Sequence, residues 1–203
     1  RVAAPWLVLK IFGKWDELLG LTPAHQGTAY LDGIWSYALG SAHLAKGNIE
    51  EARQELANLK EIADAPNANK YKVGATPASA VLQLAAFGLE GETLMAQGDL
   101  PGAISAFRKG VEIEDENNYT EPPDWAQPMR HYLGSALLKA GLLEEAEAVY
   151  RRDLRWNQNN GWSLFGLYQV LTAQNKQPEA NQIFKQWQAA WSSADVALTA
   201  SHL

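Results

Sequence analysis

The sequence of 203 residues contains no cysteine. This absence excludes disulfide bonds, thiolate catalysis and zinc sites with cysteine ligands, and it leaves the redox compartment open. Long apolar runs are also missing, and the run over residues 2–9 ends at Lys10, well short of the ~20 residues that a membrane-spanning helix requires. We therefore expect no membrane span.

Basic residues are in the minority. The 17 lysines and arginines stand against 23 acidic residues, and the formal net charge is −6. A nucleic-acid partner is disfavoured because neutralising phosphates requires a basic face. With 47% hydrophobic and 20% charged residues, the composition is that of a globular chain.

Residues that could support catalysis or metal binding are scattered. No two of the four histidines are spaced i, i+4, the spacing that would place both on one helical face, so we expect neither a metal site nor a cofactor. The acidic run at 112–116 lacks the central glycine of a calcium loop and indicates a solvated helix end. We expect no enzymatic activity. The one enzyme alternative, a hydrolase-like site, uses Glu121 or Asp124 with His131 as general acid and base.

An internal repeat is the strongest positive signal. Four segments share a marked alanine near the start of a second apolar stretch, and these alanines are separated by 51, 43 and 34 residues: Ala52, Ala103, Ala146 and Ala180. A period of 34 therefore recurs, with insertions of 17 and 9 residues. Apolar residues follow helical spacing inside each segment, which predicts two helices joined by a turn.

The turns and small residues repeat in the same register. The predicted turn position holds residues that readily adopt the left-handed conformation: Gly47, Gly98, Gly141 and Asn175. Asn48 and Asp99 are predicted helix caps, and Pro101 and Pro178 fit the first turn of the next helix. We expect the first-helix glycines to face the marked alanines, with aromatic residues filling the gap to the next repeat: Gly40, Gly91 and Gly134, and Phe107, Tyr150 and Phe184.

This pattern of a small residue, a turn glycine, an alanine and an aromatic resembles the tetratricopeptide repeat family. The resemblance implies an all-α fold, a right-handed superhelical solenoid of helix-turn-helix repeats. We predict a single domain over 1–203 with the following parts: a partial repeat at 1–23, repeats at about 33–65, 84–116, 127–159 and 161–191, and a capping segment at 192–203. Ser192, with Asp195 three residues on, predicts a short last helix in that segment.

The second half of the chain is similar to the C-terminal domain of a group of longer bacterial tetratricopeptide proteins of unassigned function. Three segments carry this likeness: 118–125, 160–167 and 190–201. The likeness implies a bacterial source, with cytoplasm and periplasm both possible, and further repeats upstream. The histidine-rich segments of that group have no counterpart here, so no chemistry is carried over from them.

The two insertions are candidate functional loops. The insertion that includes 65–77 is rich in helix breakers and predicts a surface loop, with a passive spacer favoured over a binding loop. In the second insertion two prolines precede Trp125 and fix its direction. Trp125 either staples this loop to the next helix or forms a groove rim with Tyr119 and Glu121.

In tetratricopeptide arrays the first helices line a concave face. The resemblance therefore implies a partner-binding groove lined by Arg130, His131, Ser135, Leu138, Trp162, Phe165 and Gln169. Arg130 is expected to hold a carboxylate through two hydrogen bonds, and an internal salt bridge is the alternative. For Trp162 and Phe165, which share a helical face, the alternative is ordinary core packing.

We therefore predict a module that binds a peptide or protein segment in its groove. The alternative is a scaffold that self-associates through its N-terminal face, because Leu7, Leu9, Phe12 and Trp15 lack a polar cover there. His43 is predicted to be a hydrogen-bonded core histidine, because leucine fills its position in the other repeats.

Overall fold

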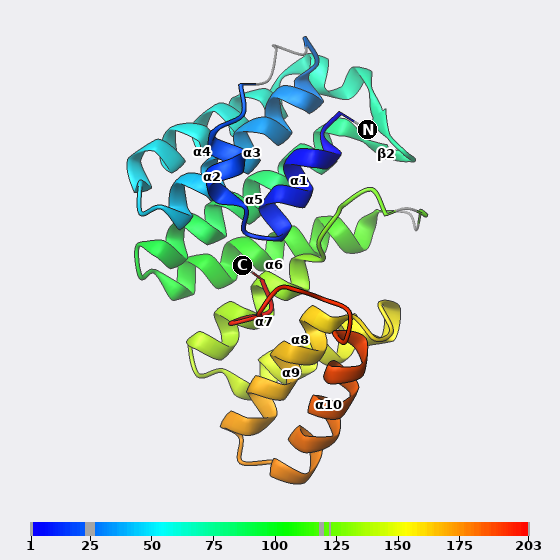
Figure 1. Ribbon diagram of the computed structural model, residues 1–203. Helices are drawn as coiled ribbons and strands as arrows, with labels where there is room; N and C mark the ends of the chain where they lie inside the picture. Colours follow the sequence, from blue (N-terminus) through cyan, green and yellow to red (C-terminus); the bar gives the residue numbers. More distant parts are fainter. Residues whose placement is uncertain (1, 23–26, 118–119, 122, 203) are drawn as a thin grey trace. The chain divides into compact units, whose positions relative to one another are not determined.

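The computed structural model describes residues 2–22, 27–117, 120–121 and 123–202 (Figure 1). Over these residues the fold is all-α: ten α-helices are joined by short turns, with one short 3-10 helix and one hairpin of two-residue strands. The chain divides into two compact units, Arg1–Gln127 and Pro128–Leu203.

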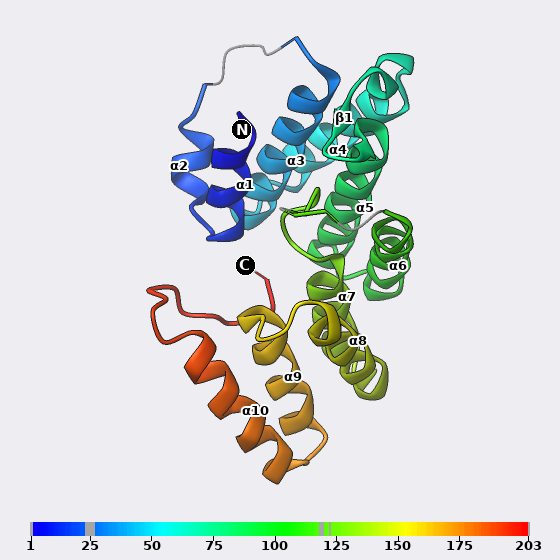
Figure 2. The same ribbon diagram turned by 90° about the vertical axis from the view of Figure 1, so that its right-hand side faces the viewer.

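Unit 1 contains two long helical hairpins. Helix α3 (Ala29–Ala45) packs against α4 (Ile49–Asp64), and α5 (Ala78–Ala96) packs against α6 (Leu100–Glu116). Helix α5 also packs on both α3 and α4, so the two hairpins stack in chain order (Figure 2). The insertion between them is not a plain loop, because it forms a 3-10 helix at Pro66–Lys70 and a hairpin of β1 (Lys72–Val73) with β2 (Thr76–Pro77).

The first two helices of unit 1 cover α3. They are α1 (Ala4–Ile11) and α2 (Trp15–Leu19). A buried ion pair fixes α1, because Lys10 Nζ lies 3.1 Å from Glu92 Oε1 and 4.8 Å from the centre of the Tyr37 ring. Ser41 donates a hydrogen bond of 2.9 Å to the same carboxylate. The outer face of α1 remains partly bare, as the sequence predicts, with Val8 50% exposed.

Unit 2 repeats the hairpin arrangement. Helix α7 (Met129–Lys139) packs on α8 (Leu143–Trp156), α9 (Gly161–Ala173) packs on α10 (Gln177–Ala190), and α9 also contacts α7 and α8. The predicted last helix is wrong: after a turn at 192–193, residues 194–202 form no helix or strand and run back from the end of α10 (Figure 2). Ser192 Oγ donates to the Ala189 carbonyl, so Ser192 closes α10 instead of capping a new helix.

The turns inside the hairpins lie at the residues that the sequence predicts. All four predicted turn residues have positive φ, between 60° and 83°. At each turn the amide of the next residue donates to the carbonyl five positions back, which is the Schellman arrangement: Asn48 to His43, Asp99 to Leu94, Leu142 to Leu137 and Lys176 to Leu171. Pro101 and Pro178 lie in first turns, as predicted.

Two of the local predictions at these turns are corrected. The Asp99 side chain accepts from the Gly102 amide as expected, whereas the Asn48 side chain makes no capping hydrogen bond among the described residues. His43 is half-buried, and its Nδ1 has no hydrogen-bond partner within the described part of the chain. The backbone carbonyl of His43, not its ring, therefore provides the interaction that the turn requires.

Close helix approach depends on glycines, several of which lie beside aromatic rings. A Cβ at Gly91 would overlap the Phe107 ring of the same hairpin, and a Cβ at Gly134 or Gly166 would overlap the Tyr150 ring. The aromatic residue of the second helix thus occupies the space beside the glycine of its own hairpin, and Tyr150 also reaches the next hairpin, as predicted. In the last hairpin Tyr168 replaces the glycine, and its ring lies 4.8 Å from that of Phe184.

We predict that Gly91→Ala destabilises the protein by about 2 kcal/mol, because the added methyl group overpacks the Phe107 ring. At a helical site with free space the same change would stabilise by about 1 kcal/mol, so the sign of the effect is decisive. Urea unfolding measures the sign and the size of this change in the free energy of unfolding. In a Phe107→Leu background the penalty for Gly91→Ala should fall by half or more, and an undiminished penalty would show that the ring is not its cause.

Candidate functional site

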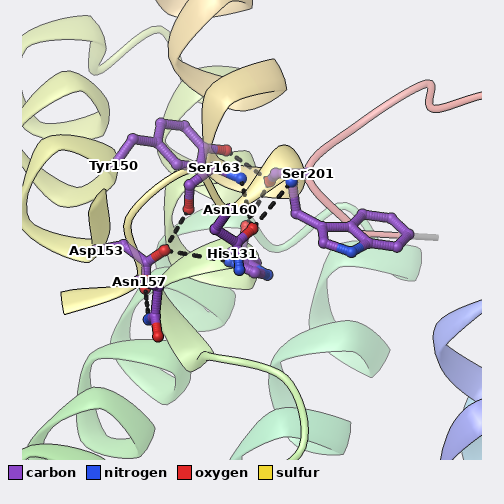
Figure 3. A network of polar contacts seen from close by, with 8 residues as sticks. His131, Tyr150, Asp153, Asn157, Asn160, Ser163 and Ser201 are labelled. Atoms are coloured by element: carbon purple, nitrogen blue, oxygen red, sulfur yellow. Dashed lines mark hydrogen bonds and ion pairs between the residues drawn. The ribbon is translucent and has the colours of Figure 1, made fainter. Parts of the chain in front are cut away.

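The most polar part of the interior lies in unit 2 around Asp153 (Figure 3). This residue of α8 is 2% exposed, and its carboxylate has three partners. Ser163 Oγ donates at 2.6 Å, Asn157 Nδ2 donates at 2.9 Å, and His131 Nε2 lies at 3.4 Å. Burial acts to raise the pKa of Asp153, but the contacts with His131, Ser163 and Asn157 outweigh it and hold this pKa below its usual value.

The turn between α8 and α9 positions these partners. Asn157 ends α8, and Asn159 adopts a positive φ of 59°, which turns the chain towards α9. Asn160 then caps α9, accepting hydrogen bonds from the amides of Trp162 at 3.0 Å and Ser163 at 3.2 Å. This cap fixes the first turn of α9, and the Ser163 hydroxyl points at Asp153 (Figure 3).

A second chain of hydrogen bonds holds Ser201. Its hydroxyl lies 2.7 Å from the carbonyl oxygen of His131 and 2.7 Å from the hydroxyl of Tyr150. A carbonyl oxygen only accepts, so the Ser201 proton goes to His131 and the Tyr150 hydroxyl donates to Ser201. Burial raises the pKa of Tyr150, so this donor keeps its proton.

The rest of the segment 192–202 lies on α7, α9 and the end of α10. Trp191 Nε1 donates to the carbonyl of Val196 at 2.8 Å, and Gln169 Nε2 donates to the carbonyl of Thr199 at 3.1 Å. The ring of His202 lies 4.7 Å from that of Tyr132. Unit 2 thus binds an extended stretch of its own chain, largely through main-chain carbonyls.

The predicted groove residues of unit 2 fall into three groups. His131 and Gln169 bind the segment directly, and Trp162 packs edge-on at 5.2 Å against Trp191, which also holds it. Phe165 instead packs against Trp187 at 5.2 Å, as its core alternative predicts. The remaining predicted residues are Ser135 and Leu138, which are half-buried, and Arg130, which is buried and already has interaction partners.

The predicted rim residues belong to unit 1. Trp125 is buried, with its ring 5.3 Å from that of Tyr37, so it packs on the earlier helix α3, whereas the sequence suggested a staple to the helix that follows the loop. Glu121 is exposed, and Tyr119 lies outside the described residues. Glu121 borders a pocket of about 660 Å³ lined by the apolar face of α1, the turn at 73–75 and residues 120, 123, 124 and 126.

Sequence reasoning missed Asp153, Ser163, Tyr150 and Ser201. The position of Asp153 within its repeat could have identified it. Seven positions after each marked alanine the other hairpins have Leu59, Gly110 and Trp187, so Asp153 places a carboxylate at a core position. A charge at such a position requires buried partners, but the register does not identify them.

The Asp153 network lacks the order of a hydrolytic triad. In such a triad the hydroxyl binds the imidazole, whereas here Ser163 and His131 bind the same carboxylate. Within the described ranges no group of three or more acidic or histidine side chains is placed to hold a metal ion, and no helix is long and apolar enough to cross a membrane. The chain matches no protein-family model and no curated protein.

Asp153 should make the stability of unit 2 sensitive to acid. Because folding lowers its pKa, Asp153 contributes stability above its ordinary pKa of 3.8, and this contribution is lost as pH falls through the folded value. Asp153→Asn should cost about 2 kcal/mol at pH 7 and flatten the loss of stability below pH ~4.

Urea unfolding at several pH values measures this difference. Glu147, whose pKa is lowered to about 2 mainly by Lys176, contributes to acid unfolding in both proteins, so the comparison isolates Asp153. The exposed Asp195→Asn is the matched control and should leave the pH profile unchanged. Parallel profiles for wild type and Asp153→Asn would contradict the assignment.

Proposed function

We propose that this protein is an interaction module of the tetratricopeptide type, whose hairpins stack as a solenoid and whose first helices bind an extended protein segment. One observation carries the proposal: α7 and α9, the first helices of unit 2, already hold an extended segment. The positive-φ turns and the 34-residue period support the repeat type.

The chemistry of this surface suits an extended ligand. The Gln169 side chain donates to a main-chain carbonyl, and such a bond is available from any extended peptide whatever its side chains. Trp162 and Trp191 add half-buried aromatic surface, which commonly anchors ligands at interfaces. A side-chain donor to a main-chain carbonyl and aromatic anchors together favour a peptide over a small molecule.

Peptide selection tests the proposal. A displayed library of random peptides is selected on the whole chain, and recovered peptides are measured by fluorescence anisotropy against wild type and Trp162→Ala/Gln169→Ala. We expect the double variant to bind at least tenfold more weakly, since it loses an aromatic anchor and a hydrogen bond.

Trp156→Ala is the matched control for this experiment. Trp156 is 74% exposed on α8 and makes no contact with the segment 192–202 among the described residues, so its loss should leave peptide binding unchanged. Circular dichroism must show equal helicity in all three proteins. Recovery of no peptide, or equal binding by the double variant, would contradict the proposal.

Self-association is a second candidate function, favoured by the bare face of α1. Val8, which lines the 660 Å³ pocket, is 50% exposed, and Phe12, the residue after α1, is 40% exposed. Sedimentation velocity over a hundredfold range of concentration should then show a dimer that Val8→Lys abolishes. A monomer throughout that range would rule this candidate out.

A further inference from the structure

Ser201 is the point at which the segment 192–202 enters the protein interior. Its relative exposure is 0%, whereas Ala197 and Thr199 are exposed and Val196, Leu198 and Ala200 are half-buried. The Ser201 hydroxyl satisfies both the Tyr150 hydroxyl and the His131 carbonyl. The site thus consists of one donor and one acceptor at the bottom of a pocket that one small side chain fills.

This site is specific to one hairpin. Four positions after the marked alanines stand Leu56, Phe107, Tyr150 and Phe184, so only the third hairpin has a hydroxyl at this position. Helix packing needs only the ring, as Phe107 against Gly91 shows. The Tyr150 hydroxyl therefore adds nothing that packing requires, and its described use is the hydrogen bond to Ser201.

The segment itself is weakly held. The one main-chain bond recorded within residues 192–202 of the described structure is that of Ala194 to the Trp191 carbonyl, at the end of α10. Among its polar contacts are those with the side chains of Trp191, Gln169 and Tyr150 and with the carbonyl of His131. Segments with few buried contacts and little backbone hydrogen bonding open locally without global unfolding.

We propose that this pocket recognises an extended segment with a serine followed by a ring residue, and that residues 196–202 are its internal competitor. The inference rests on the proposed function and specifies its ligand. Alanine in place of serine would leave the Tyr150 hydroxyl and the His131 carbonyl without this hydrogen-bond partner, and a larger side chain would overlap the groups that bury Ser201.

The internal segment sets the affinity that an external ligand experiences. A segment attached through a short connection acts at an effective concentration of about millimolar. A free peptide with the affinity of the internal segment therefore does not displace it at micromolar concentration, whereas a more tightly binding peptide selected from a library does. A substitution in residues 196–202 that weakens their binding to unit 2 opens the pocket. It changes no residue that would bind the external peptide.

A labelled peptide with the sequence of residues 195–202, Asp-Val-Ala-Leu-Thr-Ala-Ser-His, tests this inference. Its binding to the whole 203-residue chain is measured by fluorescence anisotropy for wild type and for Ser201→Ala. We expect the variant to bind the peptide at least about tenfold more tightly, because the competitor has lost its two buried hydrogen bonds. The same peptide with alanine in place of serine should bind the variant at least about tenfold more weakly.

A second variant keeps the test independent of folding. His202→Ala removes the ring contact with Tyr132 and leaves the buried hydroxyl site intact, so it should also tighten peptide binding. If Ser201→Ala lowers helicity, His202→Ala alone decides the question.

Equal peptide affinity for wild type and both segment variants would overturn the inference, and so would equal binding of the serine and alanine peptides. If the library peptides bind at Trp162 and Gln169 while the 195–202 peptide does not bind, the proposed function stands and this inference fails. If no peptide of either kind binds any variant, the proposed function fails as well.

Discussion

The packing of a second-helix ring against a first-helix glycine is the constraint on which the hairpins α5–α6 and α7–α8 depend. Phe107 lies over Gly91 in unit 1, and Tyr150 lies between Gly134 and Gly166 in unit 2. Because Tyr150 contacts α7 and α9 together, one side chain sets both the distance within a hairpin and the distance to the next. The same contacts fix the Tyr150 hydroxyl, so packing determines where the Ser201 site lies.

The polar interior of unit 2 is built by replacing apolar residues within this frame. Asp153 stands where another hairpin has leucine, and a buried carboxylate without partners would cost several kcal/mol. Ser163, Asn157 and His131 remove that cost by hydrogen bonding. The network ties α7, α8 and the start of α9 together, and it fixes the backbone of His131, whose carbonyl faces Ser201.

Local signals explain which parts of the fold were predictable. The turn glycines, Asn175 and Pro178 act within one or two turns of helix, so sequence identified them and the hairpins. The Asp153 network joins residues 131, 153 and 163, and Ser201 is 70 residues from His131. The spacing of residues in the sequence does not indicate that these distant residues contact one another. Ser192 shows the limit of a local motif, because the contacts of residues 196–202 with α7 and α9 decide the conformation of this segment.

The buried hydroxyl makes the segment 196–202 exchangeable instead of permanent. A purely apolar segment would be held by burial alone, and any apolar competitor of similar size could replace it. Ser201 instead leaves two polar groups that only a hydroxyl of the right size satisfies, so apolar competitors pay a desolvation penalty. A matching segment makes the same bonds, and exchange with it is close to neutral in free energy. Selectivity and exchangeability therefore have one cause, the hydroxyl of Tyr150 on a ring whose position packing has already fixed.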